Sequence, residues 1–214
     1  IGYGKLGGKE LGYGSDLDVV YLYDDPDQDA AQTYARLGQR LNTWLSSQTS
    51  SGIVYEIDTR LRPNGESGML AISLDGFRDY EEKSAGVWEH QALLRSRALA
   101  GTPAVCEAFE RIRREVLVAH IDRTKLRSEV AKMRQRMRKE LSQAKAGEFD
   151  LKQDAGGIAD IEFLVDYWVL EHSAQYPELV EFPDNVRQLE ALERVGLVPT
   201  GRCRQLKDAY LALR

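Results

Sequence analysis

The hydrophobic positions near the start of the chain predict two short strands. Residues 19–23 form a continuous apolar run, which is short enough to be a buried strand. Residues 53–62 instead alternate between apolar and charged side chains, which is typical of a strand with one buried face. The apolar face carries Tyr55, Ile57 and Leu61, and the opposite face carries Glu56, Asp58, Arg60 and Arg62.

Helical spacing appears between and after these strands. A stripe of Tyr34, Leu37, Leu41, Trp44 and Leu45 predicts a helix that packs its apolar side against the sheet. The serine-rich stretch 46–52 is interpreted as a helix break that leads into the second strand. Residues 69–72 and 74–83 are expected to form a short strand and a short helix.

The pattern changes after Gly101. Thr102 is a suitable N-cap and Pro103 suits the first helical position. From there to the end the apolar spacing is helical, with a mostly apolar helix predicted for residues 158–172. We therefore expect one domain over residues 1–101 and an all-helical domain over residues 102–214.

Composition and charge restrict the class of protein. The chain has 214 residues and a formal net charge of -5, which argues against non-specific nucleic-acid binding. Cys106 and Cys203 are its two cysteines, so a disulfide framework is not expected and a reducing compartment fits. No apolar run is long enough to span a membrane, which favours a cytoplasmic protein. Because Ile1 starts directly inside a motif, we expect a piece of a longer protein.

The candidate chemistry begins in the glycine-rich opening. Gly14 and Ser15 precede Asp16 and Asp18, and carboxylates two positions apart on a strand share one face. Two hard oxygen ligands beside a Gly-Ser turn suit a divalent cation and the phosphates that it neutralises. An ordinary turn capped by solvated acids would give the same pattern.

A third carboxylate favours the cation site over the solvated turn. If the charged face of residues 53–62 meets Asp16 and Asp18, the site gains Asp58 as a third metal ligand. Arg60 and Arg62 would then supply two guanidinium groups for phosphate oxygens.

Four stretches resemble known proteins. Gly-Ser followed by Asp-x-Asp, with a lone Asp on a later strand, is similar to the nucleotidyltransferase superfamily of DNA polymerase beta. Closer resemblance is to glutamine-synthetase adenylyltransferase, in which one catalytic half attaches AMP and a sister half removes it. The stretches that carry this resemblance occur in the family's order and are GYGKLGGKELGYGSDLD (2–18), SSGIVYEIDTRLRP (50–63), WEHQALLRSR (88–97) and GGIADIEF (156–163). The opening looks more like the attaching, C-terminal half.

The resemblance implies both a fold and a reaction. The fold would be α+β: a small mixed β-sheet nucleotidyltransferase domain with flanking helices, followed by the helical domain. The reaction would be metal-dependent transfer of AMP from ATP to a tyrosine of glutamine synthetase, with a PII-type signal protein regulating the full-length enzyme. Neither a nucleic acid nor a membrane is expected as a partner.

The resemblance also implies a set of site residues. The catalytic and metal-binding residues would be Asp16, Asp18 and Asp58, which would hold Mg²⁺ or Mn²⁺. Gly14 and Ser15 would cradle the departing phosphates. Lys5, Arg60 and Arg62 would neutralise the charge nearby.

Three other functions are compatible with the sequence. They are removal of AMP by phosphorolysis, uridylyl transfer to a small signalling protein, and nucleotide sensing without turnover. A pure sensor does not need all three aspartates, which argues against the last.

Further polar residues have no assigned role from sequence. Glu89 is expected to bond an arginine, and Arg95 and Arg97 either bind oxyanions or lie on a solvated face. Asp160 and Glu162 suit the first turn of a helix, and the resemblance implies that they face a cleft.

Overall fold

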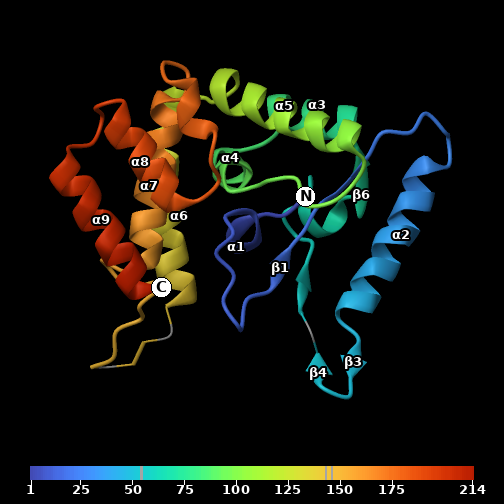
Figure 1. The fold of residues 1–214 in the computed structure, drawn as a ribbon, viewed down its shortest axis with the longest axis horizontal. Coiled ribbons are helices and arrows are strands. Elements are labelled where there is room, and N and C mark those ends of the chain that lie inside the picture. Colours follow the sequence, from blue (N-terminus) through green and yellow to red (C-terminus); the bar gives the residue numbers. More distant parts are fainter. Residues whose placement is uncertain (54, 143, 146) are drawn as a thin grey trace. The chain divides into compact units, whose positions relative to one another are not determined.

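The computed structural model describes residues 1–53, 55–142, 144–145 and 147–214. Its contacts divide the chain into two units, Ile1–Val116 and Leu117–Arg214 (Figure 1). Among the described residues, strands occur in the first unit and helices in both, which confirms the α+β class. Helix α5 (Pro103–Ala119) begins at the predicted proline and crosses from the first unit into the second. The domain boundary after residue 101 stays a prediction.

The first unit is built on short strand pairs of mixed direction. Strand β1 (Leu17–Asp18) pairs in parallel with β5 (Ile57–Asp58). Strand β2 (Tyr21–Tyr23) pairs in parallel with β6 (Ala71–Ser73). Gly2 adds antiparallel bridges to Val19 and Arg97. Gly2 therefore joins the segment that follows the glycine-rich opening, at Val19, to the segment that precedes α5, at Arg97.

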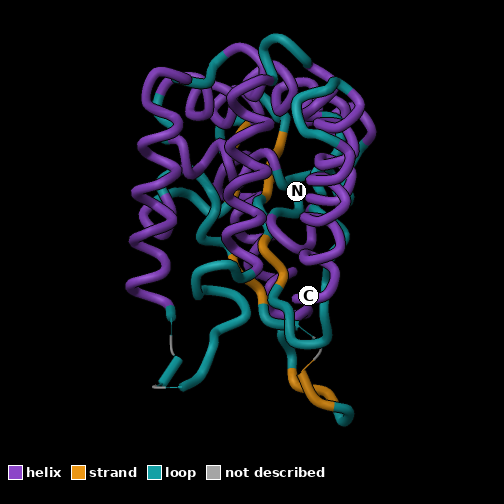
Figure 2. The backbone as a smooth tube through the Cα atoms, turned by 90° about the vertical axis from the view of Figure 1, so that its left-hand side faces the viewer, coloured by secondary structure: helices purple, strands orange, loops and turns teal. Residues whose placement is uncertain are grey.

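An antiparallel hairpin precedes β5 and was not expected from sequence. Strands β3 (Gln48–Thr49) and β4 (Gly52–Ile53) pair across a tight turn in which Gly52 has φ +106°. Both views show it standing apart from the other strands of its unit (Figures 1 and 2). The serine-rich stretch therefore reverses the chain direction, which brings β5 alongside β1.

The strand predicted over residues 53–62 is interrupted and ends early. Strand β4 ends at Ile53, residues 55–56 lie in no strand, and β5 covers Ile57–Asp58 alone. Val54 lies outside the described residues. Arg60 and Arg62 fall in the turn after β5, which continues into a short 3₁₀ helix, η1 (Gly65–Ser67). Alternation alone could not show this end, since Arg60 pairs back with Asp58 and Arg62 bonds to the loop that follows.

The helices of the first unit cover these strands. They are α1 (Gly4–Gly7), α2 (Ala30–Leu45), α3 (Leu74–Lys83) and α4 (Val87–Leu94), besides α5. The helix predicted for residues 74–83 is confirmed in full, and Ser73 caps it through the Gly76 N–H. Helix α1, a single turn inside the glycine-rich opening, was not predicted. Phe77 on α3 and Phe109 on α5 are fully buried with ring centroids 5.8 Å apart, and they form part of the core.

Helix α2 packs differently from the predicted apolar stripe. Leu37 and Trp44 are 46% and 67% exposed. The closest approach of α2 to the strands is instead at Gly38, where an added Cβ would lie 3.0 Å from the ring of Tyr21. Because β2 and β6 are only three residues long, they cover one turn of this helix and leave much of the stripe uncovered.

The second unit consists of helices among the described residues. These are α6 (Arg123–Leu141), α7 (Ile158–His172), η2 (Pro177–Val180), α8 (Asn185–Arg194) and α9 (Thr200–Leu213). Helix α7, whose predicted bounds are confirmed, contacts α6, α8 and α9 (Figure 1). Within the described part of the chain, no helix is both long and apolar enough to pass through a membrane.

Candidate active site

Three carboxylates meet at the end of the β1–β5 pair. Asp18 and Asp58 are register partners in the two strands, and Asp16 directly precedes β1. One oxygen from each of the three groups lies within 4.8 Å of the other two. The structure thus brings together the three aspartates that the sequence singled out, from two segments far apart in the chain.

The local folding of β1 explains the direction of these side chains. Leu17 donates its N–H to Glu56 O at 2.8 Å, and Val19 donates to Asp58 O at 2.8 Å. Leu17 and Val19 are buried, whereas Asp16 is exposed and Asp18 is half-buried. The alternation of a strand therefore turns the apolar side chains inward and both aspartates to the opposite face.

Arg60 holds the third carboxylate. Its Nε donates to both oxygens of Asp58, at 3.1 and 2.8 Å, and its Nη2 forms an ion pair with Oδ2. The Arg60 backbone N–H also donates to Asp58 Oδ1 at 2.8 Å. The bonds from the Arg60 side chain are the main cause that lowers the pKa of Asp58, and they outweigh the opposing effect of partial burial.

This arrangement fits a divalent cation. Mg²⁺ and Mn²⁺ prefer hard oxygen ligands, and the cluster offers three carboxylates, one exposed and two half-buried, that can be approached from solvent. A lowered pKa keeps Asp58 ionised, which is the form that binds metal. Among the described residues, no second group of three or more such ligands comes together.

The glycine-rich opening lies against Asp18. Gly4 has φ +51°, and a Cβ at this position would be 2.8 Å from Asp18 Oδ2. Tyr3 donates its N–H to Asp18 O at 2.9 Å, so the same segment binds the backbone of β1. Lys5 follows on α1 and is exposed. The candidate lysine is thus one residue from the glycine that touches Asp18.

The Gly-Ser turn before Asp16 is open to solvent. Gly12 donates its N–H to Ser15 Oγ at 3.0 Å, and Ser15 donates its own N–H to Gly12 O at 3.1 Å. A Cβ at Gly14 would meet no described atom within 4 Å. This turn leaves room for a ligand beside Asp16.

Arg62 stabilises the loop after β5. Its guanidinium donates to the carbonyl oxygens of Thr59, Glu66 and Gly68, at 2.7, 3.1 and 3.2 Å. Because the guanidinium is engaged in holding residues 59–68 together, its structural partners are known, whereas its predicted contact with nucleotide stays a prediction.

Arg95 and Arg97, for which the sequence left an oxyanion partner or a solvated face open, both contact the glycine-rich opening. Arg95 is 8% exposed and pairs with the carboxylate of buried Glu10 at 2.5 Å. Arg97 donates from Nε to Gly7 O at 2.9 Å and from Nη2 to Leu6 O at 3.3 Å. The solvated face is therefore wrong for both, and the oxyanion that Arg95 binds belongs to the chain itself. What the sequence did not indicate is the partner of each arginine in the segment over residues 6–10.

Glu89 has a structural role that differs from the expected bond to an arginine. Its carboxylate accepts the Gly86 N–H at 2.7 Å, which caps α4, and it accepts the hydroxyl of Tyr80. On the same helix Trp88 is 43% exposed, whereas Leu93 is fully buried.

Asp160 connects two helices of the second unit. It accepts bonds from Arg134 Nε at 2.7 Å, Arg138 Nη2 at 3.0 Å and the Gly156 N–H at 2.7 Å. These bonds and the nearby Arg134 charge lower the pKa of Asp160 despite its partial burial, which acts in the opposite direction. Glu162 lies two residues further along α7, where Tyr210 Oη donates to its Oε1 at 3.5 Å.

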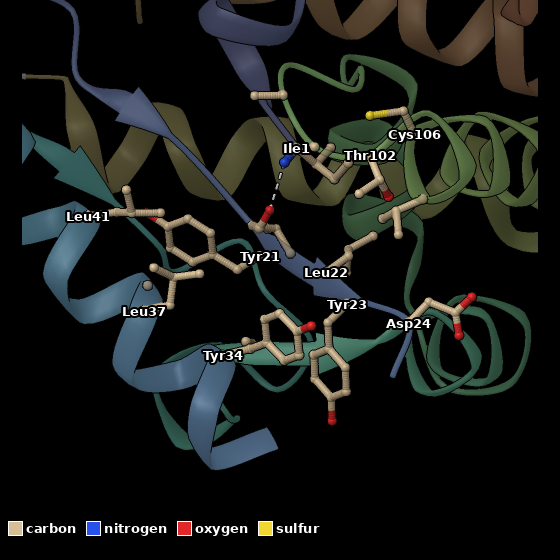
Figure 3. A pocket seen from close by; sticks show the side chains of 16 residues that line it. Ile1, Tyr21, Leu22, Tyr23, Asp24, Tyr34, Leu37, Leu41, Thr102 and Cys106 are labelled. Carbon is tan, nitrogen blue, oxygen red and sulfur yellow. Dashed lines mark hydrogen bonds between the residues drawn. The ribbon is translucent and has the colours of Figure 1, made fainter. Parts of the chain in front are cut away.

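A separate pocket of about 300 Å³ lies beside α2 in the first unit. Tyr23 and Tyr34 stack at one side of it with ring centroids 4.9 Å apart (Figure 3). Leu37, Leu41 and Cys106 also contribute to its wall (Figure 3). None of the three clustered aspartates lines this pocket, so the carboxylate site is a distinct, open surface site.

Comparisons with known protein families give two matches along the chain. Residues 1–112 match the family model described as glutamate-ammonia ligase adenylyltransferase. Residues 124–214 match the model described as PII-uridylyltransferase.

Individual relatives match over the full chain. A protein of Aromatoleum aromaticum is 52% identical, and it is named bifunctional glutamine synthetase adenylyltransferase/adenylyl-removing enzyme. Proteins of the same name from Thioalkalivibrio sulfidiphilus and Pseudomonas aeruginosa are 49% and 48% identical. All three matches cover 100% of this chain, but only 23–24% of each relative. The chain thus spans about a quarter of the length of these relatives.

Proposed function

Because the chain belongs to the glutamate-ammonia ligase adenylyltransferase family, we propose that it carries one nucleotidyltransferase centre of such an enzyme. The reaction is transfer of AMP from ATP to a tyrosine hydroxyl of glutamine synthetase. The observation that carries the proposal is the meeting of Asp16, Asp18 and Asp58, which gives a metal site next to an open glycine-rich turn. A PII-type signal protein is proposed to regulate the activity in the full-length enzyme.

The attaching reaction is favoured over the removing one by the opening segment. The relatives are named for both activities, so the name alone does not distinguish them. The sequence Gly-Tyr-Gly-Lys at residues 2–5 and Glu-Leu-Gly-Tyr at residues 10–13 resembles the attaching half. Phosphorolytic removal of AMP is the second candidate.

The three aspartates are proposed to hold Mg²⁺ or Mn²⁺. When bound, the cation supplies Lewis-acid stabilisation of the charge that develops on the attacking and leaving oxygens. Asp16 and Asp18 present their carboxylates from one strand face, and Asp58 presents its own from the paired strand. The three carboxylates would thus supply the ligand charge from the end of the β1–β5 pair.

Asp58 acts as a ligand rather than as a proton acceptor. A general base works best when its pKa lies near the pH of the reaction, and Arg60 moves the pKa of Asp58 in the opposite direction. The tyrosine of the substrate titrates near 10. Its proton passes to water as the phenolic oxygen bonds the α-phosphorus, and the bond from that phosphorus to the bridging oxygen breaks to release pyrophosphate.

The remaining residues act on the phosphates. Gly14 and Ser15 lie in the open turn and offer a backbone N–H and a hydroxyl to the departing pyrophosphate. Lys5 is an exposed cation next to Gly4 in the chain and would neutralise phosphate oxygens, while Arg60 would balance charge at the carboxylate cluster through its pair with Asp58. Arg62 contributes by keeping the loop after Asp58 in place.

The test is transfer of labelled α-phosphate from ATP to purified glutamine synthetase, with Mg²⁺ or with a chelator. We expect metal-dependent labelling of the protein, and loss of at least about 100-fold in the Asp18→Asn variant. Release of ADP from adenylylated glutamine synthetase on addition of phosphate would assign this chain to the removing reaction instead. Undiminished labelling in Asp18→Asn would exclude the carboxylate site.

A further inference from the structure

The carboxylate of Asp18 is supported by a single helical turn that cannot be stable by itself. We propose that Arg97, together with the buried Glu10–Arg95 pair, positions Asp18 by fixing α1 against it. The inference rests on the proposed function, because it treats Asp18 as a ligand of the catalytic metal. It assigns a role to two arginines that bind the glycine-rich opening.

The contact between α1 and Asp18 is too close to allow independent movement. Asp18 Oδ2 lies over the backbone of Gly4, in the space that a Cβ would occupy at a distance of 2.8 Å. Gly4 is also held in a left-handed conformation, with φ +51°. A shift of α1 toward β1 therefore displaces the carboxylate, and a shift away removes one wall of its site.

Local interactions are insufficient to fix α1. The helix has four residues, of which three are Gly4, Gly7 and the exposed Lys5. Initiating a helical turn is unfavourable, and glycine increases the loss of conformational entropy. The position of this turn must therefore come from contacts with other segments.

Arg97 supplies the first of these contacts. Its guanidinium donates to the carbonyl oxygens of Leu6 and Gly7, which end the turn. A cation at this end of a helix satisfies carbonyl groups that lack an intrahelical partner. The Arg97 backbone also exchanges two hydrogen bonds of 2.9 Å with Gly2, which fixes the other side of the same segment.

The Glu10–Arg95 pair supplies the second contact. Both side chains are under 10% exposed, and Glu10 lies three residues after the end of α1. A Cβ at Gly7 would lie 2.1 Å from Arg95 O, so the turn rests on the backbone at the end of α4. Arg113, also buried, donates to the carbonyl oxygens of Leu93 and Leu94 and keeps that end in place. The segment over residues 95–97 is thereby a rigid support for the opening.

By holding α1 against Asp18, Arg97 and the Glu10–Arg95 pair affect metal binding without contacting the metal. Groups that orient a ligand typically change metal affinity or activity by about 10–100-fold when they are removed. Arg97 is the better residue to test, because its side chain is half-buried and its loss leaves the Glu10–Arg95 pair intact. Removal of either member of that buried pair would break an ion pair inside the unit and destabilise its fold.

The experiment compares Arg97→Met and Arg97→Lys in the full-length protein. Mn²⁺ binding is followed by electron paramagnetic resonance, and the part lost in Asp18→Asn is assigned to this site. Hydrogen exchange of the amides in residues 4–10 and thermal unfolding are measured on the same samples. Arg36→Met, on the exposed side of α2, removes the same charge elsewhere in the first unit.

We expect Arg97→Met to unfold like the parent protein, to weaken Mn²⁺ binding by about 10-fold or more, and to exchange faster over residues 4–10. Lysine can donate to only one carbonyl at a time, so Arg97→Lys should recover part of the affinity. Arg36→Met should match the parent in all three measurements. Unchanged Mn²⁺ binding in a folded Arg97→Met protein would overturn the proposal, as would a parent protein without Mn²⁺ bound through Asp18.

These readouts separate the inference from the proposed function. If glutamine synthetase is not labelled but Mn²⁺ binding falls in Arg97→Met, the positioning role stands and the reaction was assigned wrongly. If labelling occurs and Mn²⁺ binding is insensitive to Arg97, the reaction stands and the positioning role is rejected.

Discussion

Asp18 Oδ2 occupies the space that a side chain at position 4 would need. The distance from this oxygen to an added Cβ on Gly4 would be 2.8 Å, whereas ordinary van der Waals contact begins near 3.4 Å. The carboxylate of a proposed metal ligand and a glycine in the preceding turn therefore share one small volume. This relationship makes the identity of residue 4 a test of the site.

Gly4→Ala should damage both stability and activity. Alanine at φ +51° is strained by about 1–2 kcal/mol, and its methyl group displaces the Asp18 carboxylate. We expect a lower free energy of unfolding and at least about a 10-fold loss of AMP transfer. Gly201→Ala is the control, because an added Cβ there meets no described atom within 4 Å and residue 201 lies in α9. Equal activity in the two variants would contradict the assignment.

Arg60→Met should raise the pKa of Asp58. The guanidinium lowers this pKa in the folded protein, so the pair stabilises the fold above the unfolded pKa of about 4. That stabilisation is lost as pH falls through the folded pKa of Asp58. Carbon NMR of the carboxyl group should show the shift, and the stability difference between parent and variant should shrink in acid. Arg40→Met on α2 controls for the lost charge, and an unchanged Asp58 titration in Arg60→Met would refute the pairing.

Glu81→Gln should stabilise the protein most at alkaline pH. Burial, with a smaller contribution from Glu89, raises the pKa of Glu81 to about 8. Since this pKa lies above the unfolded value, the folded state retains a proton that the unfolded state loses, and stability falls as pH rises from about 4 to 8. Glutamine removes this dependence and should gain on the order of 2 kcal/mol at pH 7–8.

Urea unfolding at pH 5 and pH 8 measures this effect of Glu81. Glu82→Gln, on the same helix and less buried, removes an equal charge and serves as the control. A gain in Glu81→Gln that is the same at both pH values would show that Glu81 carries no retained proton.

Asp160→Asn should destabilise the second unit. Arg134, which is 7% exposed, and Arg138 would both lose their ion pair with the Asp160 carboxylate. Allowing for the partial exposure of Asp160, we expect a cost of about 2–3 kcal/mol in urea unfolding. Asp208→Asn breaks an exposed pair with Arg204 on α9 and should cost less than about 0.5 kcal/mol. Equal costs would remove the structural role of Asp160.

Two helices could be predicted with their bounds because their spacing and flanking residues agree. Helices α3 and α7 begin and end where their apolar spacing and flanking residues indicate. The three aspartates could be predicted to share a site because strand alternation fixes the face of each one. The parallel pairing of β1 with β5 then brings the two faces together.

The features that sequence did not predict depend on tertiary partners. Helix α1 is held in place by Arg97 and by the backbone at Arg95. Its four residues are rich in glycine and carry no hydrophobic periodicity from which a helix could be predicted. Arg62 lies at an alternating position, but its guanidinium closes its own loop. The partial exposure of the α2 stripe follows from the short β2–β6 pair, whose length no pattern on α2 could indicate.

The parallel pairing of β1 with β5 has a consequence for the order of folding. Helix α2 and the β3–β4 hairpin lie between the two strands in the chain, so Asp18 and Asp58 meet only after a long loop has closed. Loop closure of this kind costs entropy before any contact between its ends is gained, which slows such pairings. The site should therefore assemble late, after α2 and the hairpin have formed locally. Metal binding measured during refolding would then report the last step in the folding of the first unit rather than its initial hydrophobic collapse.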